Sequence, residues 1–321
     1  MTSREHAPSL MSPTARTVLP TDLVALVSYD GQVYANQAIT LDRIGTQDSP
    51  SALETAFEQW FSFATGRHTW ISVKGPTLRG LISARKRGSK HAWEIDCLIN
   101  AEENDPGVLM SLLDQVTDAA GRSGAMRIFI RVPSDTMLEE DIARCGFAAY
   151  RHEHVWRLER EAGAVRAAPP SVRRRAKQDL YPLFQLYSAV VPEQVRRYEA
   201  MTLEEWLAIQ EKLGRMGQWV CDEGEGRLAG WLRTAGDGDT GRFDLIAGRA
   251  AVDDLIECAL ARLANRGCLH AIIGSHQEDV ERLLDARGFT PAEQYTVLVR
   301  RTVRPVKEAR KVPAVAQTTF G

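Results

Sequence analysis

The chain has 321 residues, a formal net charge of −2 and a sequence pI near 6.4. This length suffices for two domains of ordinary size, each with its own apolar core. The near-neutral charge argues against nucleic acid or an anionic membrane surface as a partner. No apolar run approaches the roughly 20 residues that a membrane-spanning helix needs. We therefore expect a protein that binds neither nucleic acid nor membrane.

The cysteines and the chain ends indicate the compartment. Five cysteines are present, an odd number, and no two stand in a C-x-x-C spacing. Neither a disulfide framework nor a metal site is therefore predicted. Residues 1–17 are rich in Ser, Thr, Pro and Arg and lack the apolar core of a secretory signal. We expect a cytoplasmic protein with a disordered lead-in at residues 1–17 and a disordered tail at residues 304–321.

The chain up to residue 160 predicts a first set of elements. An amphipathic helix is expected at residues 51–65, where apolar side chains recur at helical spacing. Three strand-like runs, joined as antiparallel hairpins by glycine-containing turns, follow at residues 68–74, 78–85 and 92–100. A helix, a short apolar strand, a helix and a long strand complete the set at residues 107–120, 126–132, 135–144 and 147–158. Gly146 stands where a left-handed residue would end the second of these helices.

A similar set follows a linker at residues 161–171, which is rich in Ala, Gly and Pro. It opens with a helix-rich segment at residues 179–212 and continues with strands at residues 219–222, 227–234 and 241–247. A helix, a strand, a helix and a strand are then predicted at residues 252–266, 269–273, 278–287 and 294–300. Gly288 again closes the last helix.

Matching positions in the two sets indicate a repeat. The Gly-Phe pairs begin at Gly146 and Gly288, which are 142 positions apart, and the upstream glycines Gly80 and Gly230 are 150 apart. Because the offset between matching positions changes so little, we expect two copies of one domain, at residues 18–160 and 172–303. Residues 18–50 could supply a first strand of the first copy or an added loop.

The order of elements in each copy resembles the GNAT acetyltransferase superfamily. The stretch from Val172 to Asp179, with the leucines after it, is similar to that family's opening strand and first helix. The resemblance implies an α/β (α+β) fold of two tandem GNAT-like domains, each a mixed, mostly antiparallel sheet flanked by helices. It also implies that an amine, on a small molecule or a peptide, attacks the thioester of acetyl-CoA directly, without a metal.

The family holds the pyrophosphate of acetyl-CoA on backbone N–H groups at a helix start, behind a Q/R-x-x-G-x-G/A loop. In the first copy the matching stretch begins at Asn104 and has Gly107 in the first glycine position, but Leu109 in the second. The resemblance implies Asn104, Gly107 and Val108 as cofactor-binding residues. In the second copy Arg249 occupies the basic position of a stretch without glycine, and it is the fourth candidate.

Two further residue types belong to the family's chemistry. One is a tyrosine four residues before the glycine of Gly-Phe, which acts as general acid, but these positions hold Ile142 and Leu284. The other is a general base, often a carboxylate on the central strand. Glu94 and Asp96 alternate with apolar residues, so both face one side of their strand. One of them could be the catalytic base, and the alternative is a solvated strand face.

Four side chains of the first copy's last strand share one face: Tyr150, His152, His154 and Trp156. Two histidines at i, i+2 can bind a metal, but no third ligand is indicated, so a polar and aromatic face at an interface or pocket edge is favoured.

Two functions remain open. The first is acyl-CoA-dependent N-acyl transfer, with the first copy as the catalytic one. The second is a binding or scaffold protein that keeps the fold without a working acetyl-CoA site, which the missing glycines and tyrosines favour. The sequence does not indicate an oligomeric state.

Overall fold

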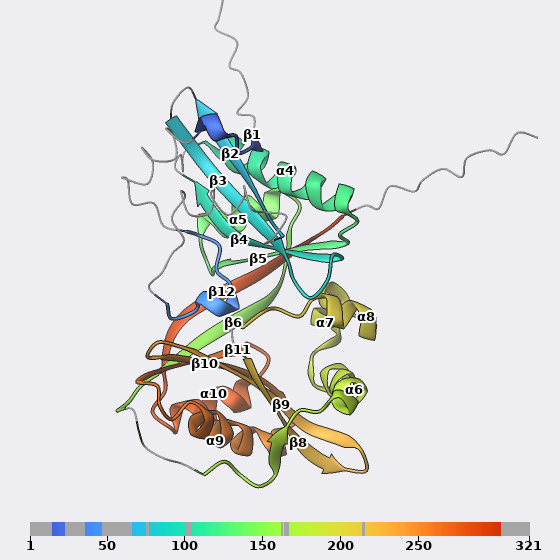
Figure 1. The fold of residues 1–321 in the computed structure, drawn as a ribbon, viewed down its shortest axis with the longest axis vertical. Helices are drawn as coiled ribbons and strands as arrows, with labels where there is room; N and C mark the ends of the chain where they lie inside the picture. The colour runs from blue at the N-terminus through green and yellow to red at the C-terminus, as the bar shows by residue number, and fades with distance from the viewer. Residues whose placement is uncertain are drawn as a thin grey trace, which may run out of the picture.

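A computed structural model describes residues 15–22, 36–46, 66–74, 77–100, 105–161, 163, 167–213 and 216–302. The predicted helix at residues 51–65, the tail at residues 304–321 and Asn104 lie outside the described residues. Within the described part, 12 strands form one continuous sheet in the order β1-β2-β3-β4-β5-β12-β6-β11-β10-β9-β8-β7 (Figure 1). The two copies therefore share a sheet, with the first copy at one end and the second at the other.

The first copy supplies five neighbouring strands at one end of the sheet. They are β1 (Ala15–Thr17), β2 (Arg67–Lys74), β3 (Thr77–Lys86), β4 (Ala92–Asn100) and β5 (Arg127–Pro133). β2, β3 and β4 are antiparallel neighbours, as the predicted turns require. β5 runs parallel to β4, because the intervening helix α4 (Pro106–Ser123) carries the chain back along the sheet.

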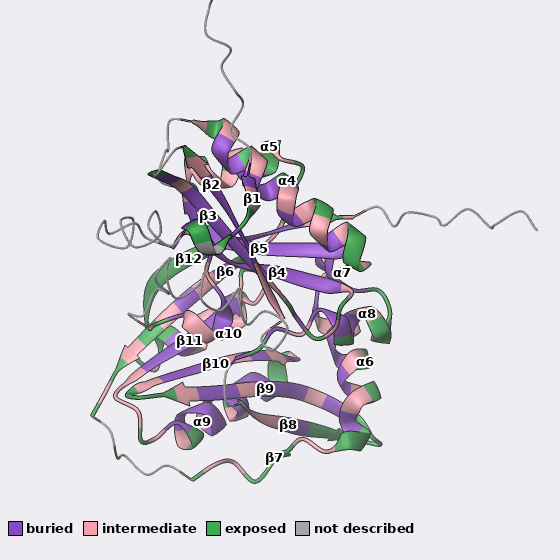
Figure 2. Cartoon of the chain, turned by 45° about the horizontal axis from the view of Figure 1, so that its top comes forward, coloured by how far each residue is buried: buried purple, intermediate pink, exposed green. Residues whose placement is uncertain are grey.

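Helix α4 owes its ends to local sequence. The Asp105 side chain caps its first turn, Pro106 takes the first helical position, and Gly124 ends it with a left-handed φ of 80°. Its apolar side chains form one stripe, which is buried against β1, β2 and β3 (Figure 2). Helix α5 (Met137–Arg144), capped by Thr136, packs beside α4 over the same core.

The second copy repeats this arrangement at the other end of the sheet. Its strands there are β7 (Val172–Arg174), β8 (Met216–Gly224), β9 (Arg227–Asp237), β10 (Thr240–Ala247) and β11 (Cys268–Gly274). Helices α9 (Val252–Arg262) and α10 (Glu278–Asp285) cover one face. Helices α6 (Leu180–Val190), α7 (Glu193–Glu199) and α8 (Leu203–Ala208) cover the opposite face. Adjacent residues of β9 divide between the two cores: Leu232 packs with α9 and Trp231 with α6 to α8.

The last strand of each copy lies beside strands of the other copy. β6 (Ala148–Glu159) pairs with β11, and β12 (Thr290–Arg301) pairs with β5, while β6 and β12 also pair with each other. Gly146 and Gly288, which precede these strands, have left-handed φ values of 84° and 83°, as predicted. Because each copy completes the other's sheet, the copies form one packed body.

Several predicted boundaries differ from the observed ones, among them those of β1 and α9. The lead-in was expected to be disordered through residue 17, yet Ala15–Thr17 is strand β1, whose Ala15 pairs with Ser72 of β2. Helix α9 was expected to reach residue 266 but ends at Arg262. It ends early because the chain makes a tight turn, Arg266 N–H to Leu263 C=O at 2.9 Å, before β11.

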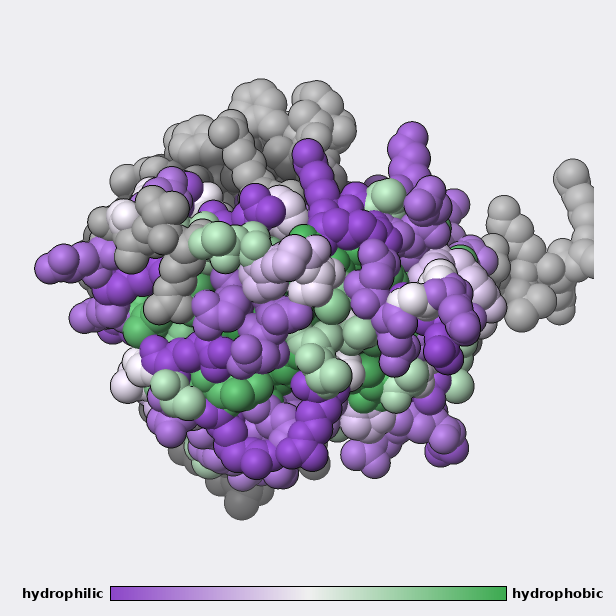
Figure 3. All heavy atoms as spheres, turned by 90° about the horizontal axis from the view of Figure 1, so that it is seen from below, coloured by the Kyte–Doolittle hydropathy of each residue, from purple (hydrophilic) through white to green (hydrophobic). Residues whose placement is uncertain are grey.

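None of the helices in the described part is long and apolar enough to cross a membrane. The face of the molecule seen from below is mostly polar, with smaller apolar areas between the polar side chains (Figure 3).

Candidate functional site

In the first copy, the gap between the two parallel strands is filled by the chain itself. β4 and β5 pair only from Ala92 with Arg127 to Glu94 with Phe129, and beyond this point they separate. Parallel strands that separate leave backbone groups without partners, and these groups need hydrogen bonds from elsewhere. A segment at residues 36–46, here called the crossing segment, supplies them.

The crossing segment bonds to both sides of this gap. The Gln37 N–H donates to the Leu98 carbonyl oxygen at 2.8 Å, and the Leu98 N–H donates to Asn36 Oδ1 at 2.9 Å. On the other side, the Ile39 N–H donates to the Arg131 carbonyl oxygen at 2.9 Å. The N–H and carbonyl oxygen of Leu98 and the carbonyl oxygen of Arg131 are thereby already bonded.

The start of α4 is also bonded internally. The Gly107 N–H donates to Asp105 Oδ1 at 3.0 Å, and the Val108 N–H donates to the Asp105 carbonyl oxygen at 3.1 Å. The Asp105 carboxylate further pairs with Arg79 at 2.5 Å. The two amides predicted to hold a phosphate are therefore engaged by Asp105, a residue that carries negative charge.

Glu94 and Asp96 are brought together on one face of β4. Arg85 Nε lies 2.6 Å from Glu94 Oε1 and 3.9 Å from Asp96 Oδ2. Asp96 also pairs with Arg67 at 2.6 Å and accepts from Ser83 Oγ at 2.6 Å. Both carboxylates are buried, so the alternative of a solvated strand face is wrong. Burial raises the pKa of Glu94, against the opposing effect of the arginines.

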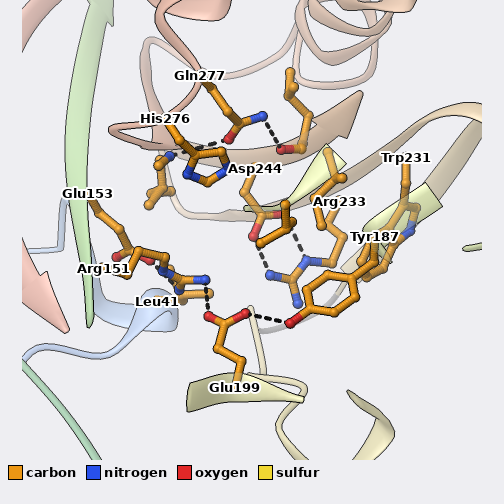
Figure 4. Close-up of a pocket in the computed structure, with 15 residues that line it drawn as sticks. Leu41, Arg151, Glu153, Tyr187, Glu199, Trp231, Arg233, Asp244, His276 and Gln277 are labelled. Atoms are coloured by element: carbon orange, nitrogen blue, oxygen red, sulfur yellow. Dashed lines mark hydrogen bonds and ion pairs between the residues drawn. The ribbon is translucent and has the colours of Figure 1, made fainter. Parts of the chain in front are cut away.

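In the second copy, the corresponding gap contains a cavity. β10 and β11 pair in parallel from Thr240 with Cys268 to Asp244 with Ile272 and then separate. We call the cavity at this point the strand-gap cavity. It is lined by residues of β6, β9, β10, β11, α6 and α7, and by Leu41 of the crossing segment (Figure 4).

Two further cavities continue from the strand-gap cavity to the start of α9. The first shares the lining residues His276 and Gln277 with the strand-gap cavity. The second shares the lining residues Val190 and Arg249 with the first. The three cavities are therefore neighbours, and we call them together the donor channel.

The start of α9 differs from that of α4. No side chain caps α9 or the 3-10 turn before it (Arg249–Ala251), in contrast to the Asp105 cap of α4. Arg249 lies at the mouth of the donor channel with 81% of its side chain exposed, 3.5 Å from Asp279. The predicted basic residue thus stands beside a helix start without a side-chain cap, and the first turn of this helix carries Asp253 and Asp254.

Polar side chains converge in the strand-gap cavity (Figure 4). Glu199 Oε2 accepts from the Tyr187 hydroxyl at 3.0 Å, and Glu199 Oε1 accepts from Arg151 and, at 3.2 Å, from Tyr150. Burial and the Glu199 carboxylate raise the pKa of Tyr187. Burial, and then Arg151, lower the pKa of His276 to about 4, so its imidazole is neutral near pH 7.

A buried ion-pair network joins the two copies beside this cavity. Arg131, which is 2% exposed, places Nε 2.6 Å from Glu153 Oε2 and Nη1 2.9 Å from Glu211 Oε2. Arg87 Nη2 lies 3.1 Å from Glu211 Oε1. Burial alone would raise the pKa of Glu211, but Arg131 and Arg87 outweigh it and lower that pKa.

The polar face of β6 is used for contacts between elements. His152 Nδ1 lies 3.1 Å from Thr296 Oγ1, and His154 Nδ1 lies 2.5 Å from Glu281 Oε1. No cluster of three or more potential metal ligands occurs among the described residues.

Sequence reasoning missed Tyr187, Glu199 and His276. Glu199 and Tyr187 belong to the helix-rich segment at residues 179–212, where no motif or spacing distinguishes them from other helical residues. His276 could have been found, because it follows β11 by two residues and ligands bind outside the carboxyl ends of parallel strands.

Comparison with solved structures defines the class of fold. The GCN5-related N-acetyltransferase from Sphaerobacter thermophilus superposes with a TM-score of 0.53 at 13% sequence identity, over 92% of this chain and 98% of that one. A tandem GNAT protein from the clavulanic acid biosynthesis pathway superposes with a TM-score of 0.46 at 14% identity, over 87% of this chain and 93% of that one. No family model and no curated protein sequence matches the chain. The chain has the GNAT fold in two tandem copies, as the resemblance implies.

Proposed function

We propose that the chain is an N-acyltransferase that takes its acyl group from acyl-CoA, and that the second copy holds the acyl-CoA. The observation that carries this proposal is the donor channel, which runs from the open strand gap of the second copy to the start of α9. The filled gap and the Asp105 cap of the first copy argue against binding there.

The residues along the donor channel fit the parts of acyl-CoA. The uncapped start of α9 offers backbone N–H groups and a positive dipole end to the pyrophosphate, and Arg249 adds a cation. The strand-gap cavity would receive the acyl end, near His276 and Glu199. The bound acyl-CoA supplies an activated thioester. Under this proposal the role of Glu94 and Asp96 is structural, because their ion pairs with Arg85 and Arg67 stabilise the first copy.

The reaction requires a proton acceptor for the attacking amine. We assign this role to His276, whose imidazole faces the strand-gap cavity in its neutral form. The amine nitrogen forms a bond to the acyl carbon, the carbon–sulfur bond breaks with its electron pair on sulfur so that CoA leaves as the thiolate, and the amine proton passes to His276. The position of the family's general acid holds Leu284, which is fully buried in the core.

Calorimetric titration of acetyl-CoA tests the proposal with one substitution in each copy. Ala250→Glu adds a carboxylate at the exposed start of α9, where an acidic residue does not disturb a helix. Gly107→Glu makes the same change at the start of α4. We expect micromolar binding that Ala250→Glu abolishes and Gly107→Glu leaves unchanged. The opposite pattern would assign the site to the first copy.

The rival function is a scaffold protein without a working acetyl-CoA site. It is favoured by the first copy, in which the gap is filled, and by the absence of both family tyrosines. If neither acetyl-CoA nor free CoA binds at millimolar concentration, the scaffold function is the correct one.

A further inference from the structure

We propose that Leu41 of the crossing segment restricts the donor to acyl-CoA with a short acyl group, of about two to four carbon atoms. This inference rests on the proposed function, because it concerns the acyl end of the same donor. It is carried by the size of the strand-gap cavity, by the ion pairs in its wall and by the way Leu41 is held against it. The residue that limits the acyl group in the second copy then belongs to a segment of the first.

The strand-gap cavity is the smallest of the three cavities of the donor channel. It offers about 90 Å³ to groups of the size of water, against about 260 Å³ and 480 Å³ in the other two. One water molecule needs about 10–15 Å³ of such space, so the strand-gap cavity holds roughly six to nine groups of that size. An acetyl group and the attacking amine fit within this limit, whereas a hexanoyl group would fill the cavity alone.

Ion pairs between largely buried side chains form one wall of the strand-gap cavity. Arg233 Nε donates to Asp244 Oδ1 at 2.8 Å, and Arg151 Nη1 lies 2.5 Å from Glu199 Oε1. Arg151 also pairs with Glu153. An alkyl chain that pushed into this wall would separate the charges from their partners, which is unfavourable in a buried place. The acyl group therefore cannot extend in this direction.

Leu41 closes the cavity on its apolar side and is itself fixed. It is 3% exposed and begins a 3-10 turn, Leu41–Arg43. On one side of this turn, the Ile39 N–H is bonded across the gap of the first copy. On the other side, Asp42 Oδ1 lies 3.0 Å from Arg85 Nη2. Because the backbone is held at both points, the Leu41 side chain cannot move away from a longer acyl group.

The surroundings of Leu41 are apolar and would suit an alkyl chain if this side chain were shorter. Leu41 belongs to an apolar cluster that includes Val155, Ile272 and Tyr295. Figure 4 shows Gln277 at one side of the cavity and Leu41 at the other, so a donor that enters past Gln277 points its acyl end toward Leu41. Leu41→Ala should therefore admit an acyl group longer by about three carbon atoms, the number that the substitution removes.

Calorimetric titration of free CoA, acetyl-CoA and hexanoyl-CoA into the full chain measures this limit without an acceptor. Each added methylene group strengthens binding to an apolar site that has room for it, so an unrestricted cavity would favour hexanoyl-CoA. We expect the opposite order, with acetyl-CoA bound at least tenfold more tightly than hexanoyl-CoA. Equal binding of the two thioesters would overturn the inference and leave the proposed function standing. If neither thioester nor free CoA binds, the proposed function fails and this inference fails with it.

Substitutions in one apolar cluster assign the limit to Leu41. Leu41→Ala should shift the ratio of the two affinities at least tenfold toward hexanoyl-CoA, and the milder Leu41→Val should shift it less in the same direction. Leu213→Ala is the matched control, because Leu213 is fully buried in the same cluster but is not among the described residues that line the cavity. Its ratio should stay within about twofold of that of the unchanged chain. Urea denaturation checks that each variant is folded. Equal shifts for Leu41→Ala and Leu213→Ala, or no shift in either, would contradict the role of Leu41.

Discussion

The backbone N–H of Ile39 donates to the carbonyl oxygen of Arg131 at 2.9 Å, across the strand gap of the first copy. The same crossing segment then continues to the second copy, where Leu41 lines the strand-gap cavity and the Ile44 carbonyl oxygen accepts from Arg242. One segment therefore closes the gap of the first copy and forms part of the wall of the second. Under the proposed function, this relationship is the reason why the second copy, and not the first, holds the acyl-CoA.

The fit of the crossing segment against the second copy can be tested at Gly45. This residue has a left-handed φ of 74°, and an added Cβ would overlap the imidazole ring of His270. We expect Gly45→Ala to lower the free energy of unfolding by at least about 2 kcal/mol. Gly124→Ala is the matched control, because its φ is 80° but nothing lies within 4 Å of an added Cβ. Its cost should be roughly 1 kcal/mol in urea denaturation, and equal losses would contradict the predicted clash.

The buried network between the copies should be sensitive to loss of one partner. Arg131→Ala leaves the buried carboxylates of Glu153 and Glu211 without their main cation, which should lower the free energy of unfolding by about 3–5 kcal/mol. Arg144→Ala removes exposed pairs with Glu140 and Asp141 and should cost about 0–1 kcal/mol. Chemical denaturation of both variants measures the difference. A small loss for Arg131→Ala would mean that the network contributes little.

The role of His276 predicts a particular pH profile for acyl transfer. His276→Asn should lower kcat roughly 100-fold if the imidazole accepts the amine proton. Because the pKa of His276 is lowered to about 4, the ratio of the two rates should stay constant from pH 8 to about pH 5 and fall only below it. Thiol release from acetyl-CoA at each pH gives this ratio. A ratio that falls around pH 6.5 would show an imidazole with an ordinary pKa.

The same histidine should make stability depend on pH. The folded-state pKa of His276 is about 4, below the ordinary histidine value of 6.5, so the unfolded chain binds the proton more readily. Its contribution is therefore complete above pH 6.5 and is lost as the pH falls toward 4. Relative to His276→Asn, the unchanged chain should lose about 1.4 kcal/mol of unfolding free energy between pH 7.5 and 5.5. Urea midpoints at the two pH values measure this loss, and parallel changes in both proteins would contradict it.

The sequence by itself determined the elements and their repetition. The alternating apolar residues of β4, the helical stripe of α4 and the left-handed glycines Gly146 and Gly288 are local signals, and each specified its own segment. The α4 cap could be recognised because Asp105, Pro106 and Gly124 act within one or two turns. The resemblance to a tandem GNAT fold followed from the order of these elements.

Only the tertiary structure decided which strands became neighbours and which gap stayed open. The position of β12 beside β5 depends on pairing between residues such as Leu298 and Ile130, and no local pattern encodes so distant a partner. The closing of the first gap likewise depends on the crossing segment, and the buried Glu94 depends on its ion pairs with Arg85 and Arg87. The convergence of Glu199 and His276 requires α7 and β11 to meet at one cavity. Such contacts are fixed by packing over the whole chain, and therefore the candidate site could not be located from sequence periodicity alone.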